Sequence, residues 1–160
     1  MMKNFIYKAV LSLLFGSLLL IGAFENLAIL LNLKPFLAFH QGSEELAIYA
    51  ETINETVGDV IINTLMSLAL IPYMGLFVSM VIVYLIFRKN VIHWTIFLFI
   101  FIAGYILIRF EITKLFINIS YVFSFNINLI ASILLLIFLS ILFFRFSWLY
   151  SKKIQLKERI

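Results

Sequence analysis

Residues 34–59 read KPFLAFHQGSEELAIYAETINETVGD and contain five of the eight acidic residues of the chain: Glu44, Glu45, Glu51, Glu55 and Asp59. The sequence on either side is strongly apolar, and 64% of all 160 residues are hydrophobic while only 12% are charged. Soluble domains are about half apolar and about a quarter charged. We therefore predict that this segment is the one sizeable part outside the lipid in a membrane protein.

The apolar stretches that flank this loop predict four transmembrane helices. A crossing needs about 20 predominantly apolar residues. The stretches place the helices at about 5–33, 60–87, 91–108 and 129–147, with an outer loop at 34–59 and a basic cytoplasmic tail at 148–160. The predicted fold is an all-α, four-transmembrane-helix bundle that forms a single membrane domain over 1–160.

The first of these helices has an alternative interpretation as a cleaved signal peptide. Lys3 and Lys8 precede an apolar core, as in secretory signals. However, no A-x-A-like site follows, and the apolar character continues beyond Glu25. We therefore favour a retained helix.

The outer loop itself predicts a short amphipathic helix. Lys34-Pro35 is expected to end the first transmembrane helix or to turn it into the headgroup region, because the residue before a proline avoids the helical conformation. Gln41-Gly42-Ser43 predicts a turn with Ser43 as the N-cap, and Glu44 and Glu45 then suit the positive end of the helix dipole. This helix would lie along the membrane interface.

The second transmembrane helix contains two features of helix packing. Pro72 removes one backbone hydrogen bond and predicts a kink. Gly75 and Ser79 are small residues four positions apart, a spacing that allows membrane helices to approach closely.

The distribution of basic residues predicts the orientation. Alternating the ends of the four helices places nine of the twelve lysines and arginines on the side of the two termini and three on the loop side. An excess of basic residues marks the cytoplasmic face. Both termini are therefore predicted to be cytoplasmic, with the protein in a bacterial inner or cell membrane.

Glu25 and Arg109 form the first candidate site. Counting from the helix ends gives both residues a similar depth in the outer half of the membrane. Charges at membrane depth are costly, and they are usually paired or face a cavity. The two residues are thus an ion or coupling site, an interfacial ion pair that fixes helix contacts, or two side chains that reach separately to the headgroups.

A polar row leading from the loop into the second helix is the other candidate. Glu51, Glu55, Asp59, Asn63 and Ser67 recur every four residues. Together with Glu44 and Glu45, the glutamates form a candidate outer acidic surface that would gather cations and pass them to Asn63 and Ser67. The alternative is a solvated helix that continues as a polar helix–helix contact.

Other classes of site find little support. The chain contains no cysteine and two histidines, which excludes disulfides and cysteine-ligated metals. His40 with Glu44 or Glu45 lacks a second histidine on the same side, so no metal site is predicted. No catalytic motif is present. The short, dispersed basic clusters argue against nucleic-acid binding. We therefore predict no cofactor and no enzymatic activity.

Ser43-Glu44-Glu45-Leu46-Ala47 resembles the S-E-E-L-A stretch in the small four-helix subunits of tripartite (TRAP-type) transporters. The resemblance covers these five residues, and IYAETINETVGD then intervenes where that family begins its second membrane helix. It implies an accessory subunit of a transport complex.

Three functional hypotheses follow from the sequence. The first is a non-enzymatic subunit of a larger membrane complex, whose partners are the lipid bilayer and other subunits or copies of itself. The second is a small oligomeric transporter or channel that uses Glu25 and the outer acidic surface. The third is a membrane enzyme that acts on lipid.

Overall fold

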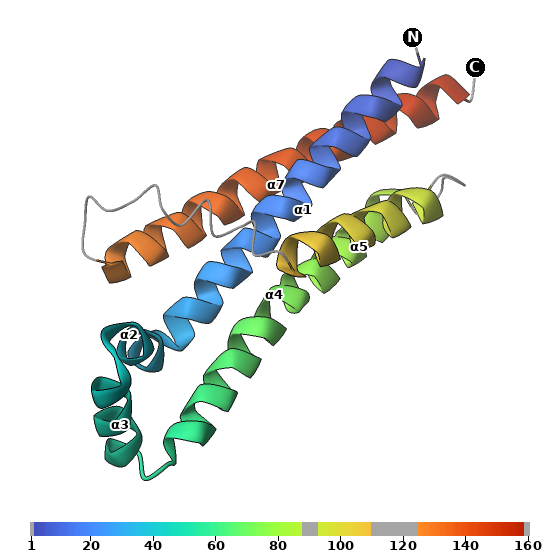
Figure 1. Ribbon diagram of the computed structural model, residues 1–160. Helices are drawn as coiled ribbons and strands as arrows, with labels where there is room; N and C mark the ends of the chain where they lie inside the picture. The colour runs from blue at the N-terminus through green and yellow to red at the C-terminus, as the bar shows by residue number, and fades with distance from the viewer. Residues whose placement is uncertain (1, 88–92, 110–124, 159–160) are drawn as a thin grey trace.

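The computed structural model describes residues 2–87, 93–109 and 125–158, and all of its elements are helices (Figure 1). The prediction of an all-α chain is confirmed for these residues. In chain order the helices are α1 (Met2–Leu31), α2 (Leu33–Gln41), α3 (Ser43–Thr52), α4 (Val57–Phe87), α5 (His93–Arg109) and α7 (Phe125–Glu158).

Helix α1 lies between α7 on one side and the hairpin of α4 and α5 on the other (Figure 1). It runs antiparallel to α7 and α4 and parallel to α5. The Ser140 hydroxyl donates to the Gly16 carbonyl at 2.8 Å, and further along α1 Asn26 Nδ2 donates to Ser132 Oγ at 2.8 Å. The residue number of the partner on α7 decreases as the residue number on α1 increases, so the two helices run in opposite directions. The two ends of the chain therefore lie at the same end of the molecule.

The core is built from small and branched side chains of all four long helices. Ala9, Leu13 and Leu20 of α1 pack with Val83 of α4, Ile100 of α5 and Phe144 of α7. On α7 the residues that face inwards include fully buried small ones, Ser140, Ser147 and Ser151. Small residues allow membrane helices to approach closely, because lipid supplies little hydrophobic drive for packing.

Among the described residues, three helices are long and apolar enough to cross a bilayer, as expected for an integral membrane protein. They span Ile6–Leu31, Val57–Ile86 and Asn126–Lys153. Helix α5, at the third predicted crossing, has 17 described residues, which extend about 26 Å at about 1.5 Å per residue. The hydrocarbon core is about 30 Å thick. Four crossings therefore stay a prediction.

The predicted outer loop is more helical than expected, because it holds two short helices. Helix α1 ends before Asn32, and Lys34-Pro35 lies in the first turn of α2. The break lies at Asn32, two residues before this dipeptide, and the chain turns there into α2. Proline is tolerated in a first helical turn, where backbone N–H groups have no helical acceptor. Ser43 is likewise the first residue of α3, and Gly42, at a φ of 136°, forms the break instead.

Helices α2 and α3 are held on α4 by a small second core. It comprises Ala38 of α2, Leu46 and Ala50 of α3, and Val60 of α4, all buried. The predicted apolar face of the loop helix is thus present, and it packs on protein.

Two long helices differ from their predicted outlines. Helix α7 continues through Glu158, although the sequence predicted that it ends at 147. Helix α4 is continuous across the buried Pro72, and its predicted kink stays a prediction. Gly75 lies against Phe24 of α1, with ring atoms 3.0 Å from where a Cβ would be, so the predicted close approach occurs here.

Candidate functional site

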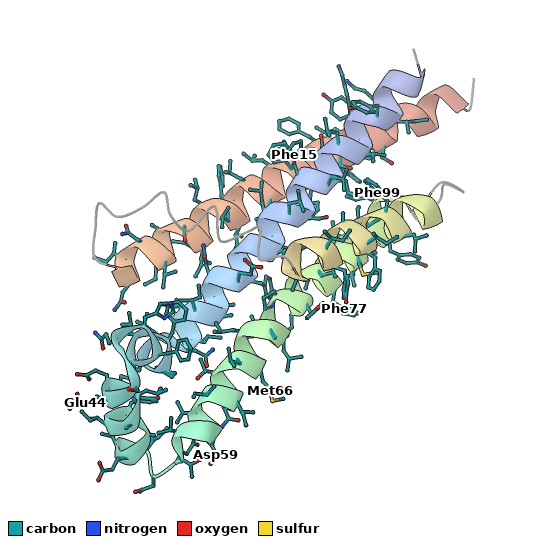
Figure 2. All side chains as sticks on the ribbon, in the orientation of Figure 1. Phe15, Glu44, Asp59, Met66, Phe77 and Phe99 are labelled. Atoms are coloured by element: carbon teal, nitrogen blue, oxygen red, sulfur yellow. The ribbon has the colours of Figure 1, made fainter. Side chains whose placement is uncertain are left out.

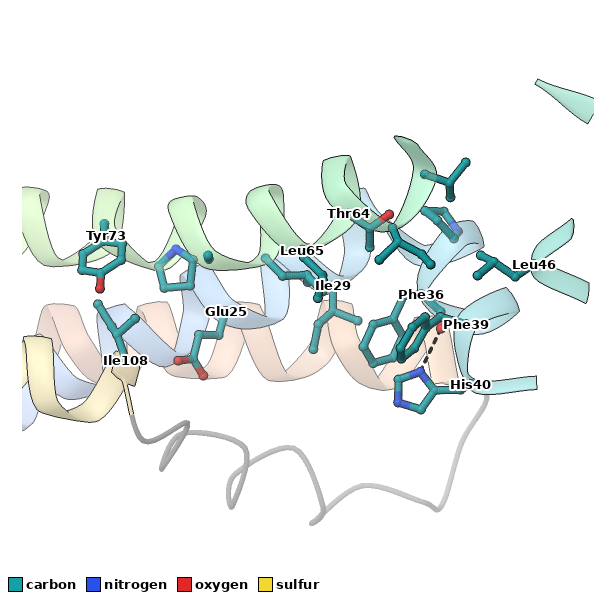
Figure 3. Close-up of a pocket in the computed structure, with 16 residues that line it drawn as sticks. Glu25, Ile29, Phe36, Phe39, His40, Leu46, Thr64, Leu65, Tyr73 and Ile108 are labelled. Carbon is teal, nitrogen blue, oxygen red and sulfur yellow. Dashed lines mark hydrogen bonds between the residues drawn. The ribbon is translucent and has the colours of Figure 1, made fainter. Parts of the chain in front are cut away.

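A cavity of about 440 Å³ lies between α1 and α4 and is covered by α2 and α3 (Figure 3). Glu25, Tyr73 and Ile108 lie at one end, and Phe36 and His40 lie at the other, with Ile29 and Leu65 between them. The lining on α4 extends from Val60 to Tyr73, which corresponds to about 20 Å along a helix axis. The cavity is therefore an elongated slot along the helices.

One polar contact fixes the corner of α1 and α2 at the edge of this slot. Asn32 Nδ2 lies 2.8 Å from the Ala28 carbonyl and 2.7 Å from Ser67 Oγ of α4. The amide thereby caps the end of α1 and joins it to α4. Since α2 begins at Leu33, this contact also sets where Phe36 and His40 enter the slot.

The lining is mostly apolar, with a small number of polar groups. Among its described residues Glu25 is the one carboxylate, and no lysine or arginine is present. Thr64 is buried on the α4 side, and Pro72, which precedes Tyr73, also lines the slot. Because proline has no N–H, the carbonyl of Leu68 cannot receive the usual helical hydrogen bond. Among the described residues of the lining, Glu25 is therefore the acidic side chain of a mostly apolar slot.

His40 is exposed and lies at the end of the slot away from Glu25, which we call the mouth. Its Nδ1 is 2.9 Å from the Phe36 carbonyl, and its ring is close to the rings of Phe36 and Phe39, with centroid distances of 4.3 and 5.9 Å. These contacts place three aromatic rings beside one another at the mouth. Among the described residues, no group of three His, Asp or Glu side chains is arranged to hold a metal ion.

The structure separates the other residues of the predicted ion site. Ser67 is bonded to Asn32, whereas Asn63 is exposed on α4 and is absent from the described cavity lining. Asp59 serves the start of α4: its backbone N–H donates to Thr56 Oγ1 at 3.2 Å, and that hydroxyl donates to Asp59 Oδ2 at 2.6 Å. This pair is a helix N-cap.

The four-residue row from Glu51 to Ser67 does not lie on one helix. Glu51 is in α3, Glu55 is in the connection, and α4 begins only at Val57. Together with Glu44 and Glu45, these glutamates are exposed. Figure 2 shows Glu44 and Asp59 at the same end of the molecule. The candidate acidic surface is thus placed around the α3–α4 corner.

Arg109 is the last residue of α5, and its side chain lies outside the described residues. The residue before it, Ile108, lines the slot at the end where Glu25 lies. The helix position is compatible with the predicted pair. The pairing of Glu25 with Arg109 stays a prediction.

Two contacts of α1 were missed from the sequence, although a signal for them was present. Asn26 and Asn32 interrupt an apolar helix, and a buried amide is expected to have a hydrogen-bond partner. The structure supplies Ser132 to the first and Ser67 to the second. Thr64 was missed because a threonine in an apolar helix does not indicate which face it occupies.

No protein-family model, no curated protein and no solved structure matches this chain.

Proposed function

We propose that this protein is a small transport-type membrane protein that binds an organic cation in the slot between α1 and α4. The observation that carries the proposal is Glu25, the one carboxylate in an elongated, apolar slot lined by aromatic rings. A charged side chain at membrane depth is costly, and such residues mark ion or substrate paths. Phe36, Phe39 and Tyr73 add ring faces, which attract cations.

The proposed orientation has both termini in the cytoplasm and the α2–α3 cover on the outer side. Its support is the basic excess on the side of the termini. The acidic surface of α3 would then face outwards beside the mouth of the slot, where it raises the local concentration of cations. The chain has no cysteine, so single cysteines test the orientation. Ile48→Cys should react with an impermeant thiol reagent added outside intact cells, whereas Gln155→Cys should react only after lysis.

The binding proposal is tested with two probes of the same shape and opposite charge. Tetraphenylphosphonium and tetraphenylborate are titrated into the purified protein in detergent, and binding is followed by calorimetry. We expect the cation to bind and the anion not to bind. Glu25→Gln should lose cation binding, whereas Glu44→Gln, which removes an exposed carboxylate of α3, should retain it.

Equal cation binding by Glu25→Gln and the unsubstituted protein would exclude Glu25 as the site. Equal binding of both probes would show that the slot selects for apolar character rather than charge. Exchange of the labelled cation across liposomes containing only this chain then separates transport from binding.

The second candidate is a non-enzymatic subunit of a larger membrane complex. It is favoured by the open arrangement of the helices. Only 28% of the most apolar 18-residue stretch of α4, and 33% of the corresponding stretch of α7, is buried within the chain. A protein partner could cover these faces in place of lipid. A subunit should co-purify with its partner at a fixed stoichiometry and lose stability when expressed alone.

A further inference from the structure

One face of α7 changes from apolar to basic towards the C-terminal end of the helix. Phe138, Ile141, Arg145, Trp148 and Lys152 follow one another at intervals of three and four residues, which places them in a single stripe on a helix. All five are exposed, whereas Ser140, Ser147 and Ser151 are buried. We call the five exposed residues the α7 stripe.

We expect the α7 stripe to cross the depth at which hydrocarbon gives way to headgroups. Helix α7 has 34 residues, which extend about 51 Å at about 1.5 Å per residue. That length exceeds the hydrocarbon thickness of about 30 Å. The apolar span ends at Lys153, so Phe138 and Ile141 lie on the hydrocarbon side of the stripe and Lys152 on the headgroup side. Tryptophan between them is at its preferred interfacial position.

The side chains of Arg145 and Lys152 come close to the same position along the axis of α7. The Lys152 ammonium lies 3.9 Å from the centroid of the Trp148 ring, so it is drawn back along the helix. Trp148 is three residues from Arg145, or about 4.5 Å along the axis. One phosphate beside Trp148 would therefore be within reach of both cations, with an acyl chain along Ile141 and Phe138.

The surrounding charges favour a negatively charged ligand. The described acidic side chains are Glu25 on the second half of α1 and the carboxylates of α3, the connection and the start of α4, which lie towards the other end of the molecule (Figure 2). Exposed Lys8 of α1 and Lys153 of α7 add positive charge at the end of the stripe. We infer that the α7 stripe binds one anionic phospholipid, with its phosphate on Arg145 and Lys152.

The test uses the fluorescence of Trp148. Trp94 is the other tryptophan of the chain, so Trp94→Phe leaves Trp148 as the sole emitter. This protein is reconstituted in vesicles of phosphatidylglycerol and phosphatidylcholine in equal amounts, with brominated acyl chains on either one lipid or the other. Bromine quenches tryptophan only at short range, so the ratio of the two quenching values reports which lipid occupies the site.

We expect phosphatidylglycerol to be preferred at Trp148 about tenfold or more, since each basic residue near the surface contributes about 1 kcal/mol towards anionic lipid. Arg145→Gln combined with Lys152→Gln should reduce this ratio to nearly one. Lys153→Gln removes the same type of charge one position away and outside the stripe, and it should largely retain the preference.

Two results would contradict the proposal that the α7 stripe binds an anionic phospholipid. Equal quenching by the two brominated lipids in the Trp94→Phe protein shows that no anionic lipid is selected, as when a protein partner or mixed lipid covers the stripe. An equal loss of preference in Lys153→Gln and Lys152→Gln shows general surface attraction rather than a site. Because Arg145, Lys152 and Lys153 are exposed, their substitution should retain the fold, and helical circular dichroism verifies this for every variant, Trp94→Phe included.

Discussion

The contact of α1 with α7 depends on the absence of a side chain at Gly16. A Cβ at this position would lie 3.0 Å from two ring atoms of Phe144 and 3.3 Å from the Cβ of Phe143. Phe144 is only 9% exposed and belongs to the main core, so its ring has little room to move. The Cβ of Phe143 is fixed to the backbone of α7. Gly16→Ala must therefore displace the two helices or distort the core.

The change that Gly16→Ala causes in the free energy of unfolding follows from two opposing effects. Replacing a glycine inside a helix with alanine stabilises by about 0.8–1 kcal/mol through helix propensity. Overpacking a well-filled core costs about 1–3 kcal/mol. Gly58 near the start of α4 supplies the matched control, because a Cβ there would meet only Thr56 Oγ1, at 3.7 Å. We expect Gly16→Ala to be less stable than Gly58→Ala by about 1–3 kcal/mol, a factor of about 5 to 150 in the unfolding equilibrium.

The assay is reversible unfolding in mixed micelles, in which the mole fraction of sodium dodecyl sulfate is raised and helicity is followed. Phe144→Leu in the Gly16→Ala background should recover part of the loss, because the smaller side chain relieves the contact. If Gly16→Ala is as stable as Gly58→Ala, then the close packing of α1 on α7 at this position is refuted.

Three further substitutions test smaller features of the fold by the same unfolding measurement. Asn32→Ala and Ser67→Ala should each destabilise by about 0.5–1.5 kcal/mol, and the double variant should cost about as much as Asn32→Ala alone, because Asn32→Ala already removes the bond to Ser67 together with the bond to Ala28; additive losses would contradict a shared bond. Thr56→Ala should cost about 1 kcal/mol by removing the cap that Asp59 completes, and amide exchange should rise in the first turn of α4 only. Gly42→Ala should cost about 1–3 kcal/mol, because its φ of 136° belongs to a region nearly restricted to glycine; an unchanged stability would contradict that conformation.

The long helices could be predicted from the sequence because each is an apolar stretch bounded by charged or polar residues. Their ends were less predictable. The break between α1 and α2 occurs at Asn32, where an apolar run continues on both sides and the nearest strong signal is Lys34-Pro35. Proline at that position fits the first turn of a new helix as well as the end of an old one. The tertiary bond from Asn32 to Ser67 then favours the earlier break.

The candidate site was predictable in part, because a charged residue is conspicuous in an apolar stretch. Glu25 is conspicuous because a carboxylate in an apolar helix is costly, and the structure places it on the slot. The row from Glu51 to Ser67 is divided between two helices, because the chain breaks between α3 and α4. A four-residue period places side chains on one face only inside a single helix. The serines of α7 gave no signal, since a serine in an apolar helix can bond to its own helix and needs no partner. Their role follows only from the position of α1.

Adjacent residues of α1 connect the proposed site to the rest of the molecule. Side chains one residue apart on a helix point about 100° apart, so Glu25 lines the slot while Asn26 faces α7 and bonds to Ser132. Half of the most apolar 18-residue stretch of α1 is buried, which is more than in α4 or α7. Glu25 is therefore on the most buried of these three helices.

The opposite wall of the slot includes α2 and α3, which pack on α4 through a small second core and follow the break at Asn32. A ligand that enters from the side of the acidic surface would then be admitted by displacement of α2 and α3 rather than of α1. Locking α2 to α3 and α4 with engineered disulfides should slow cation entry without changing the position of Glu25, whereas unchanged entry rates would show that the slot opens elsewhere.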